Sequence, residues 1–444
     1  MATNLSNEPI LPNQLCSAMH GQHLFFISAG DPSGDVHAEK LVKALSRRLP
    51  NARFVGFAGP KTAGTVCDVR FDLTKYAAMM LKKALINIPV YFKLLAQADR
   101  IFREEKPDAV ILVDFPGFNF KIAQKAKAAG IPVIYFMPPQ VWGWGQWRVK
   151  KMRKYVDLVL SCFEFEHEWF SCHGCRSVFV SHPFFEESRS RNLDHSFMNK
   201  FISEGLDSTL VTTSEEELFT SNRKSLIVLP GSRDQEVKSN LPFLLSILKE
   251  VIKKTPEVRP IFAAYKHEQA EYIRQILSER SLDYEVYAEK TPELLRVATC
   301  CLGVSGSVSI EALSLHKPLV IIYKISRLEY FALRFLKRVK FITLSNILWV
   351  HSLKDETPFY PEGKIASKTE YTMHERNLMI CPEYLFFDSC QIKNASSHLT
   401  NWFSNPELLR QTQRSLIKLR KETDLVEKPI ERAAEAIIQE VQKR

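Results

Sequence analysis

The feature that most constrains the fold of this chain is a recurring pattern of short apolar runs. Each run is followed by a loop of small or polar residues and then by a segment with helical periodicity. In the first half the runs are residues 24–28, 54–58 and 109–113. The last of these, Ala-Val-Ile-Leu-Val, contains no polar residue, as expected for a strand covered by helices on both faces. Strand, helix and strand at this spacing predict a parallel α/β sheet.

The second half of the chain repeats the pattern, with apolar runs at residues 225–229, 260–264, 300–304 and 319–323. A polar stretch between the halves, residues 186–223, predicts a connection between two α/β domains of similar size. The expected boundaries are residues 1–187 for the first domain, 188–224 for the connection and 225–424 for the second domain, with an amphipathic helix at about 425–444 that packs back on the first.

The charge balance predicts an anionic partner. The chain carries 60 Lys and Arg residues against 50 Asp and Glu residues, a formal net charge of +10 over 444 residues. Nucleic acid, a phosphorylated small molecule and an acidic membrane surface all fit such an excess. No apolar run is long enough to cross a membrane, and residues 1–22 lack the pattern of a secretory signal.

The nine cysteines are scattered, and Cys172 and Cys175 have no second pair at zinc-ligand spacing. We therefore expect free thiols, no metal site and a reducing, cytoplasmic compartment.

Ligands of an open parallel sheet bind where the carboxyl ends of strands lead into helices, and two such loops lie in the first half. Residues 30–35, Gly-Asp-Pro-Ser-Gly-Asp, would let a substrate approach the backbone, although they do not form a dinucleotide fingerprint. Asp114 follows the most apolar run, and partial burial there would raise the pKa of its carboxyl toward that of a useful base. On the residues alone, polar groups that only cap a turn remain an alternative in both loops.

Two loops of the second half carry the chemistry of a phosphate site. Arg233, at the end of Pro-Gly-Ser-Arg, offers a forked cation, and residues 305–307, Ser-Gly-Ser, open a helix in a way that suits a diphosphate. Glu311, one helical turn further, is either an acceptor for ribose hydroxyls or a solvated helix residue.

Three further segments combine apolar and basic residues. The aromatic residues at 142–147 precede a basic stretch, but no RNA- or zinc-finger pattern accompanies them, so nucleic acid is disfavoured. Residues 77–86 and 328–350 have the composition of helices in an anionic membrane interface, and packed core helices are the alternative.

In this order, the motifs resemble the lipid-A-disaccharide synthase family, glycosyltransferases of GT-B architecture. The resemblance runs from about residue 24 to residue 350 and is carried by Ala29–Asp35, Pro50–Gly56, Ala58–Pro60, Asp114–Asn119, Val141–Trp144, His182-Pro183, Leu229–Arg233 with Glu236-Val237, Ser305–Ser307 with Glu311-Ala312, and Leu344–Leu348. It implies two Rossmann-like parallel-sheet domains that face each other across a cleft.

The resemblance also implies a reaction. The family transfers a diacylated glucosamine from UDP to the 6-hydroxyl of diacylglucosamine 1-phosphate with inversion, and it needs neither metal nor cofactor. Asp114 would be the general base and Asp31 a second essential carboxylate. Substrate or UDP binding would fall to Gly30, Ser33, Gly34, Arg233, Ser305, Gly306, Ser307, Glu311 and Asn346, and lipid contact to Met79, Met80, Leu81 and Leu85. The implied location is peripheral, on the inner face of the cytoplasmic membrane, with an anionic membrane surface as partner and a homodimer left open.

The sequence departs from the family pattern near the substrate loops. Asp31 stands where the family usually has Glu, Gly117 replaces a common Asp, and Met80 replaces a Gly. About thirty extra residues precede Pro382-Glu383, and Phe386 stands at a Gln position. Two alternatives therefore remain: a UDP-sugar transferase with a different lipid acceptor, and a UDP-sugar- or lipid-binding protein without turnover.

Overall fold

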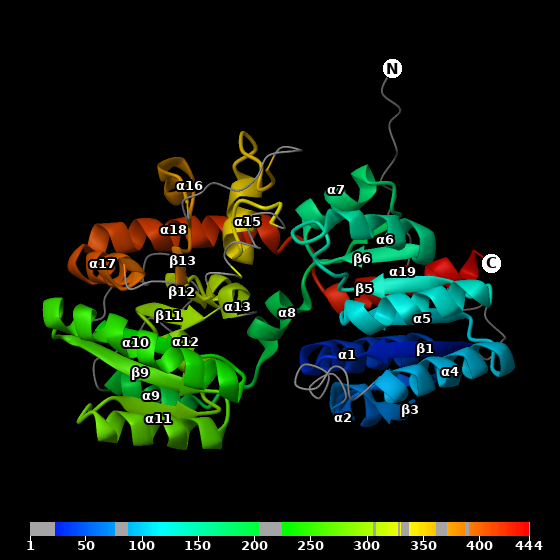
Figure 1. The fold of residues 1–444 in the computed structure, drawn as a ribbon, viewed down its shortest axis with the longest axis horizontal. Helices are drawn as coiled ribbons and strands as arrows, with labels where there is room; N and C mark the ends of the chain where they lie inside the picture. Colours follow the sequence, from blue (N-terminus) through cyan, green and yellow to red (C-terminus); the bar gives the residue numbers. More distant parts are fainter. Residues whose placement is uncertain are drawn as a thin grey trace. The chain divides into compact units, whose positions relative to one another are not determined.

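The computed structural model describes residues 23–75, 88–203, 224–304, 308–326, 329, 337–360, 371–386 and 390–443. The chain forms two compact units, each built on one parallel sheet (Figure 1). The first unit comprises Met1–Pro139, Arg148–Val180 and Lys428–Arg444, and the second comprises Gln140–Trp147 and Ser181–Glu427.

The sheet of the first unit has seven strands in the order β3-β2-β1-β4-β5-β6-β7, all paired in parallel. Its strands are β1 (Leu24–Ala29), β2 (Arg53–Ala58), β3 (Cys67–Asp72), β4 (Ala109–Val113), β5 (Val133–Phe136), β6 (Leu158–Ser161) and β7 (Ser177–Phe179). Its helices are α1 (Pro32–Arg48), α2 (Pro60–Ala63), α4 (Ile88–Glu104), α5 (Pro116–Ala128), α6 (Val149–Tyr155), α7 (Glu164–Cys172) and α19 (Pro429–Gln442). The 3-10 turn η1 (Gln146–Arg148), just before α6, contains the point where the chain passes from the second unit to the first. All residues of β1, β4 and β5 are buried, as their unbroken apolar runs predict.

The last helix, α19, packs against α1 of the first unit (Figure 1). Arg47 and Arg48, in the last turn of α1, both donate hydrogen bonds to the Glu431 carboxylate of α19.

The second unit has a six-stranded parallel sheet in the order β10-β9-β8-β11-β12-β13. Its strands are β8 (Lys224–Leu229), β9 (Val258–Ala264), β10 (Glu285–Ala288), β11 (Cys300–Val304), β12 (Leu319–Lys324) and β13 (Glu383–Phe386). Its helices are α8 (Pro183–Ser190), α9 (His195–Ser203), α10 (Asp234–Lys254), α11 (His267–Glu279), α12 (Thr291–Val297), α13 (Val308–Ser314), α15 (Leu344–Ser352), α16 (Met373–Asn377), α17 (Cys390–Ser404) and α18 (Pro406–Thr423).

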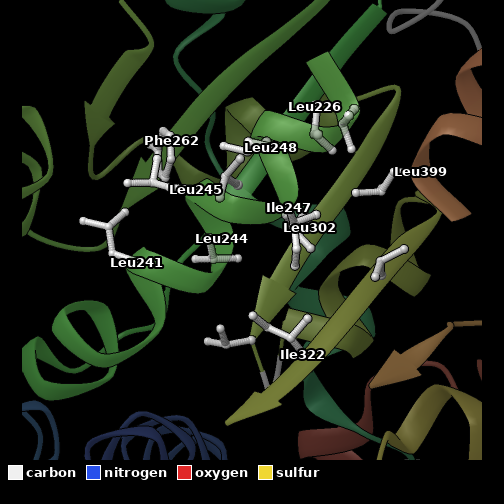
Figure 2. Packing of buried hydrophobic residues seen from close by; sticks show 14 of the residues in the cluster. Leu226, Leu241, Leu244, Leu245, Ile247, Leu248, Phe262, Leu302, Ile322 and Leu399 are labelled. Atoms are coloured by element: carbon white, nitrogen blue, oxygen red, sulfur yellow. The ribbon is translucent and has the colours of Figure 1, made fainter. Parts of the chain in front are cut away.

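The core of the second unit lies between this sheet and α10. Figure 2 shows the buried face of α10, with Leu241, Leu244, Leu245 and Leu248, among the strand residues Leu226, Phe262 and Leu302. The spacing of these leucines is that of one helix face, so the apolar stripe of α10 seals one side of the sheet.

The structure places the boundaries of the units differently from the sequence-based expectation of a polar connection at 188–224. Residues 183–203 form α8 and α9 within the second unit, and residues 204–223 lie outside the described part. Phe201 is fully buried, and Phe197 and Phe201 both make ring contacts with Tyr287. A polar average composition concealed this apolar helix face.

Residues 140–147 also belong to the second unit, although they lie within the span expected for the first domain. Trp142 is buried against Phe359, and the Gly143 carbonyl accepts a hydrogen bond from the Arg338 backbone N–H. The Trp-Gly-Trp motif is therefore part of a packed core in this unit.

Within the ranges that the structure describes, no helix is both long and apolar enough to span a membrane. The same residues contain no group of His, Cys, Asp and Glu side chains arranged to hold a metal ion.

Candidate active site

Two predicted loops of the first unit emerge side by side, because β1 and β4 are adjacent strands. Ala29, the last residue of β1, pairs with Val113, the last residue of β4. Asp114 follows Val113 directly and Asp31 follows Ala29 after one glycine, so the parallel register brings both carboxylates to the same edge of the sheet.

The Asp114 carboxyl has the electrostatics of a base that works near neutral pH. Burial raises its pKa from 3.8 to about 6, and the negative charge of Asp31 adds to this rise. A hydrogen bond from the Phe115 backbone N–H opposes the rise in the pKa only in part. A carboxyl with a pKa of about 6 is ionised at pH 7 and remains basic enough to accept a proton in a transition state.

The backbone at Asp114 is unusual. Asp114 and Phe115 both have left-handed conformations, with φ of 48° and 46°, and Phe115 is the N-cap of α5. Such conformations in residues with a side chain cost about 1–3 kcal/mol each and occur often at functional sites. Gly30 fits against this turn: a Cβ atom at Gly30 would lie 2.2 Å from the Phe115 ring, so the two loops interlock only with glycine there.

The remaining residues of the 30–35 loop divide into accessible and structural positions. Ser33 is exposed in the first turn of α1, whereas Gly34 is buried beside the Val113 carbonyl. The buried Asp35 carboxylate accepts hydrogen bonds from the backbone N–H groups of Gly59, Lys61 and Thr62. Asp35 therefore anchors the loop before α2, which explains why the 30–35 and 58–60 motifs occur together.

Gly117 is one of the departures from the family pattern, and the structure shows open space beside it. No atom lies within 4 Å of where a Cβ atom of Gly117 would be. The position therefore has room for a larger side chain.

In the second unit, Arg233 and Glu311 follow adjacent strands, β8 and β11, whose residues Leu229 and Gly303 are paired. The Arg233 side chain is 66% exposed and pairs with Glu236 at 3.1 Å. Burial raises the pKa of Glu311, and its ion pair with Arg191 at 2.8 Å opposes this change. Residues Ser305, Gly306 and Ser307, between β11 and α13, lie outside the described residues, as do Met79, Met80, Leu81 and Leu85.

Asn346 was expected to line the nucleotide cleft, but the structure buries it completely. Its side-chain N–H groups donate to the Cys381 carbonyl and to the Glu383 carboxylate, and its side-chain oxygen accepts from the N–H groups of Ile380 and Cys381. An amide side chain has two donor hydrogens and two acceptor sites, so all are occupied within the protein. Asn346 is a structural residue that ties α15 to the start of β13.

The contacts of Glu383 in β13 are complete despite the extra residues that precede Pro382. Glu383 is buried in β13, bonds to Asn346 and accepts hydrogen bonds from the Ile342 and Thr343 backbone N–H groups. Tyr371, near the end of the extra segment, donates a hydrogen bond to the same carboxylate. The extra segment therefore leads into β13 without disturbing the hydrogen bond between Asn346 and Glu383.

Sequence reasoning missed three residues around Asp114: Ser28, Asn119 and Tyr135, all fully buried. Ser28 and Tyr135 stand within apolar runs, where they look like ordinary strand residues. Asn119 belongs to the Asp114–Asn119 motif, but its position in the sequence did not indicate that its side chain bonds to the ends of β1 and β4.

Comparison with known proteins identifies the relatives of this chain. The family model described as lipid-A-disaccharide synthetase matches residues 25–359. The lipid-A-disaccharide synthase of Nitrosococcus oceani is 32% identical over 329 residues, which cover 73% of this chain and 80% of that protein. Lipid-A-disaccharide synthase 1 of Legionella pneumophila (strain Paris) is 28% identical over 396 residues, or 89% of this chain and 92% of that protein.

Among solved structures, the UDP-GlcNAc 2-epimerase of Neisseria meningitidis bound to UDP-GlcNAc superimposes with a TM-score of 0.53. It is 13% identical, over 95% of this chain and all of that one. The S. aureus MnaA-UDP co-structure gives a TM-score of 0.52 at 12% identity, over 89% and 91% of the two chains. At this identity the similarity concerns the fold alone, and it confirms the expected pair of Rossmann-like units of the GT-B class.

Proposed function

Because the chain belongs to the lipid-A-disaccharide synthase family, we propose that it is the glycosyltransferase that joins two diacylglucosamine units into the lipid A disaccharide. The donor would be UDP-diacylglucosamine and the acceptor diacylglucosamine 1-phosphate. The observation that carries the proposal is the Asp31–Asp114 pair at the ends of β1 and β4, where a buried carboxyl has a pKa of about 6.

In the proposed reaction, Asp114 accepts the proton of the acceptor 6-hydroxyl as the hydroxyl oxygen attacks C1 of the donor sugar. The new C1–O6 bond forms on one face while the bond from C1 to the diphosphate oxygen breaks on the other, which inverts C1 and releases UDP. Only the ionised form of Asp114 can take the proton, and its pKa keeps most of it ionised at pH 7.

The leaving diphosphate needs positive charge, and Arg233 is placed to supply it in the second unit. Its guanidinium is exposed, and its ion pair with Glu236 is solvent-screened and weak. A diphosphate offers a bidentate partner of higher charge, so exchange of partners would favour the nucleotide. Glu311, whose half-buried carboxylate pairs with Arg191, is the proposed partner of the ribose hydroxyls.

We also propose that the protein acts at an anionic membrane surface, since both proposed substrates carry acyl chains. The net charge of +10 supports this, as does α6, where Lys150, Lys151, Arg153 and Lys154 are all exposed. The predicted lipid-contacting residues 79–85 lie outside the described part of the chain.

The test is to incubate the purified protein with UDP-diacylglucosamine and diacylglucosamine 1-phosphate and to analyse the products by mass spectrometry. The expected result is the disaccharide 1-phosphate together with one equivalent of UDP, and no UDP when the acceptor is omitted. Binding of UDP without a product would overturn the acceptor assignment. If UDP is released only with other lipid acceptors, the protein is a UDP-sugar transferase with a different lipid acceptor.

A further inference from the structure

The backbone carbonyl of Asp114 is held by two buried side chains. The Tyr135 hydroxyl donates a hydrogen bond to it at 2.7 Å, and the Asn119 side-chain amide donates another at 2.7 Å. Tyr135 comes from β5, next to β4 in the sheet, and Asn119 comes from the first turn of α5. Both side chains are fully buried, so water does not compete for the carbonyl from their side.

Asn119 is in turn fixed by the end of β1. The Ser28 hydroxyl donates to the Asn119 side-chain oxygen at 2.6 Å, and the Asn119 amide also approaches the carbonyls of Ser28 and Val113 at 3.3 and 3.2 Å. Ser28 is fully buried. The ends of β1, β4 and β5 are therefore joined by one amide and two hydroxyls around a single peptide group.

This peptide group is the one that needs support. It links Asp114 to Phe115, the two consecutive residues with left-handed backbone. The net contribution of one such hydrogen bond to stability is comparable with the strain of one left-handed residue. Loss of one donor would therefore let the turn relax, and the carboxyl of Asp114 would move with it.

We propose that Tyr135 and Asn119, supported by Ser28, are positioning residues that hold the strained Asp114–Phe115 turn and thereby aim the Asp114 carboxyl beside Asp31. The proposal rests on the proposed function for its kinetic consequences, but the placement of the carboxyl can be measured without activity.

The groups that face Asp114 determine which way its titration would move. They are Asp31 on the loop after β1, Tyr135 on β5 and Cys162 after β6. Burial raises the pKa of both Tyr135 and Cys162 well above their ordinary values, so neither is charged near pH 6. A relaxed turn would give the Asp114 carboxyl more water or more distance from Asp31, and either change lowers its pKa toward 3.8.

Tyr135→Phe is the direct test, because it removes one donor and keeps the ring. We expect kcat for disaccharide formation to fall roughly tenfold with KM little changed, as for loss of about one hydrogen bond in the transition state. The acid limb of the pH–rate profile should move to lower pH. Tyr155→Phe, which removes the hydroxyl that accepts a hydrogen bond from Gln124 elsewhere in the same unit, is the matched control and should change neither kcat nor the acid limb.

The readout that does not depend on turnover is the pKa of Asp114 itself, followed by carboxyl ¹³C NMR and assigned by the signal lost in Asp114→Asn. The wild-type value should be about 6 and should fall in Tyr135→Phe and in Ser28→Ala, the milder variant if Tyr135→Phe folds poorly. An unchanged Asp114 pKa together with unchanged kcat in a folded variant would overturn the positioning role. A shifted pKa in a protein that forms no disaccharide would support the positioning role and refute the proposed function instead.

Discussion

The charged residues at the strand ends of the two units are held by different kinds of contact. At the end of β4, Asp114 sits in a turn whose carbonyl is fixed by buried groups, Asn119 and Tyr135. At the ends of β8 and β11, Arg233 and Glu311 are engaged by other charged side chains, Glu236 and Arg191. The first site is held by contacts that a substrate cannot replace, whereas the second is held by contacts that an anionic ligand can exchange.

The difference follows from the physical chemistry of each task. A general base must be oriented and have a suitable pKa before the substrate arrives, which favours burial and a rigid backbone. A nucleotide site must bind and release its ligand in every cycle, and an exposed ion pair such as Arg233–Glu236 is weak enough to open. We therefore expect substitutions in the first unit to act mainly on kcat and substitutions in the second mainly on nucleotide affinity.

Asp114→Asn should have the largest effect. It removes the proton acceptor and keeps the shape of the side chain, so kcat should fall by about 10²–10⁴. The affinity for UDP, measured by isothermal titration calorimetry, should stay within a factor of two or so, since the proposed nucleotide residues lie in the other unit. A near-normal kcat in this variant would show that Asp114 is not the general base and that the two sites do not differ in the way proposed.

Arg233→Ala should give the complementary result. Loss of a charged hydrogen-bonding partner of the diphosphate should weaken UDP binding by about ten- to a hundredfold, with a smaller effect on stability because the side chain is exposed. Arg280→Ala, at an exposed position after α11 in the same unit, is the charge-matched control. Equal UDP affinity in both variants would show that Arg233 does not hold the nucleotide.

Much of the fold was predictable because its signal is local. Apolar runs such as Ala109–Val113 can only be buried strands, and alternation with helices fixes a parallel sheet. The position of α9 was not predictable, because four apolar residues among polar neighbours do not show which domain they face.

The candidate site was predictable only where a residue's role follows from its place at a strand end. That reasoning singled out Asp114, Arg233, Glu311 and the loop that contains Asp31, and their roles remain predictions. It misassigned Asn346, because an amide looks the same whether it faces a ligand or satisfies buried backbone groups. The left-handed turn at Asp114 was also not predicted, since a bulky residue such as Phe115 rarely adopts this conformation.

The most direct test of the account is the pH dependence of kcat/KM in the wild-type protein and in Asp31→Asn. We predict that the wild-type activity falls below pH about 6, as Asp114 becomes protonated. Removal of the Asp31 charge lowers the pKa of Asp114, so the acid limb of the variant should lie at lower pH, while any titration of the acceptor phosphate is the same in both proteins. An acid limb that stays in place, or an activity that does not fall at acid pH, would contradict the assignment of Asp114 as the base.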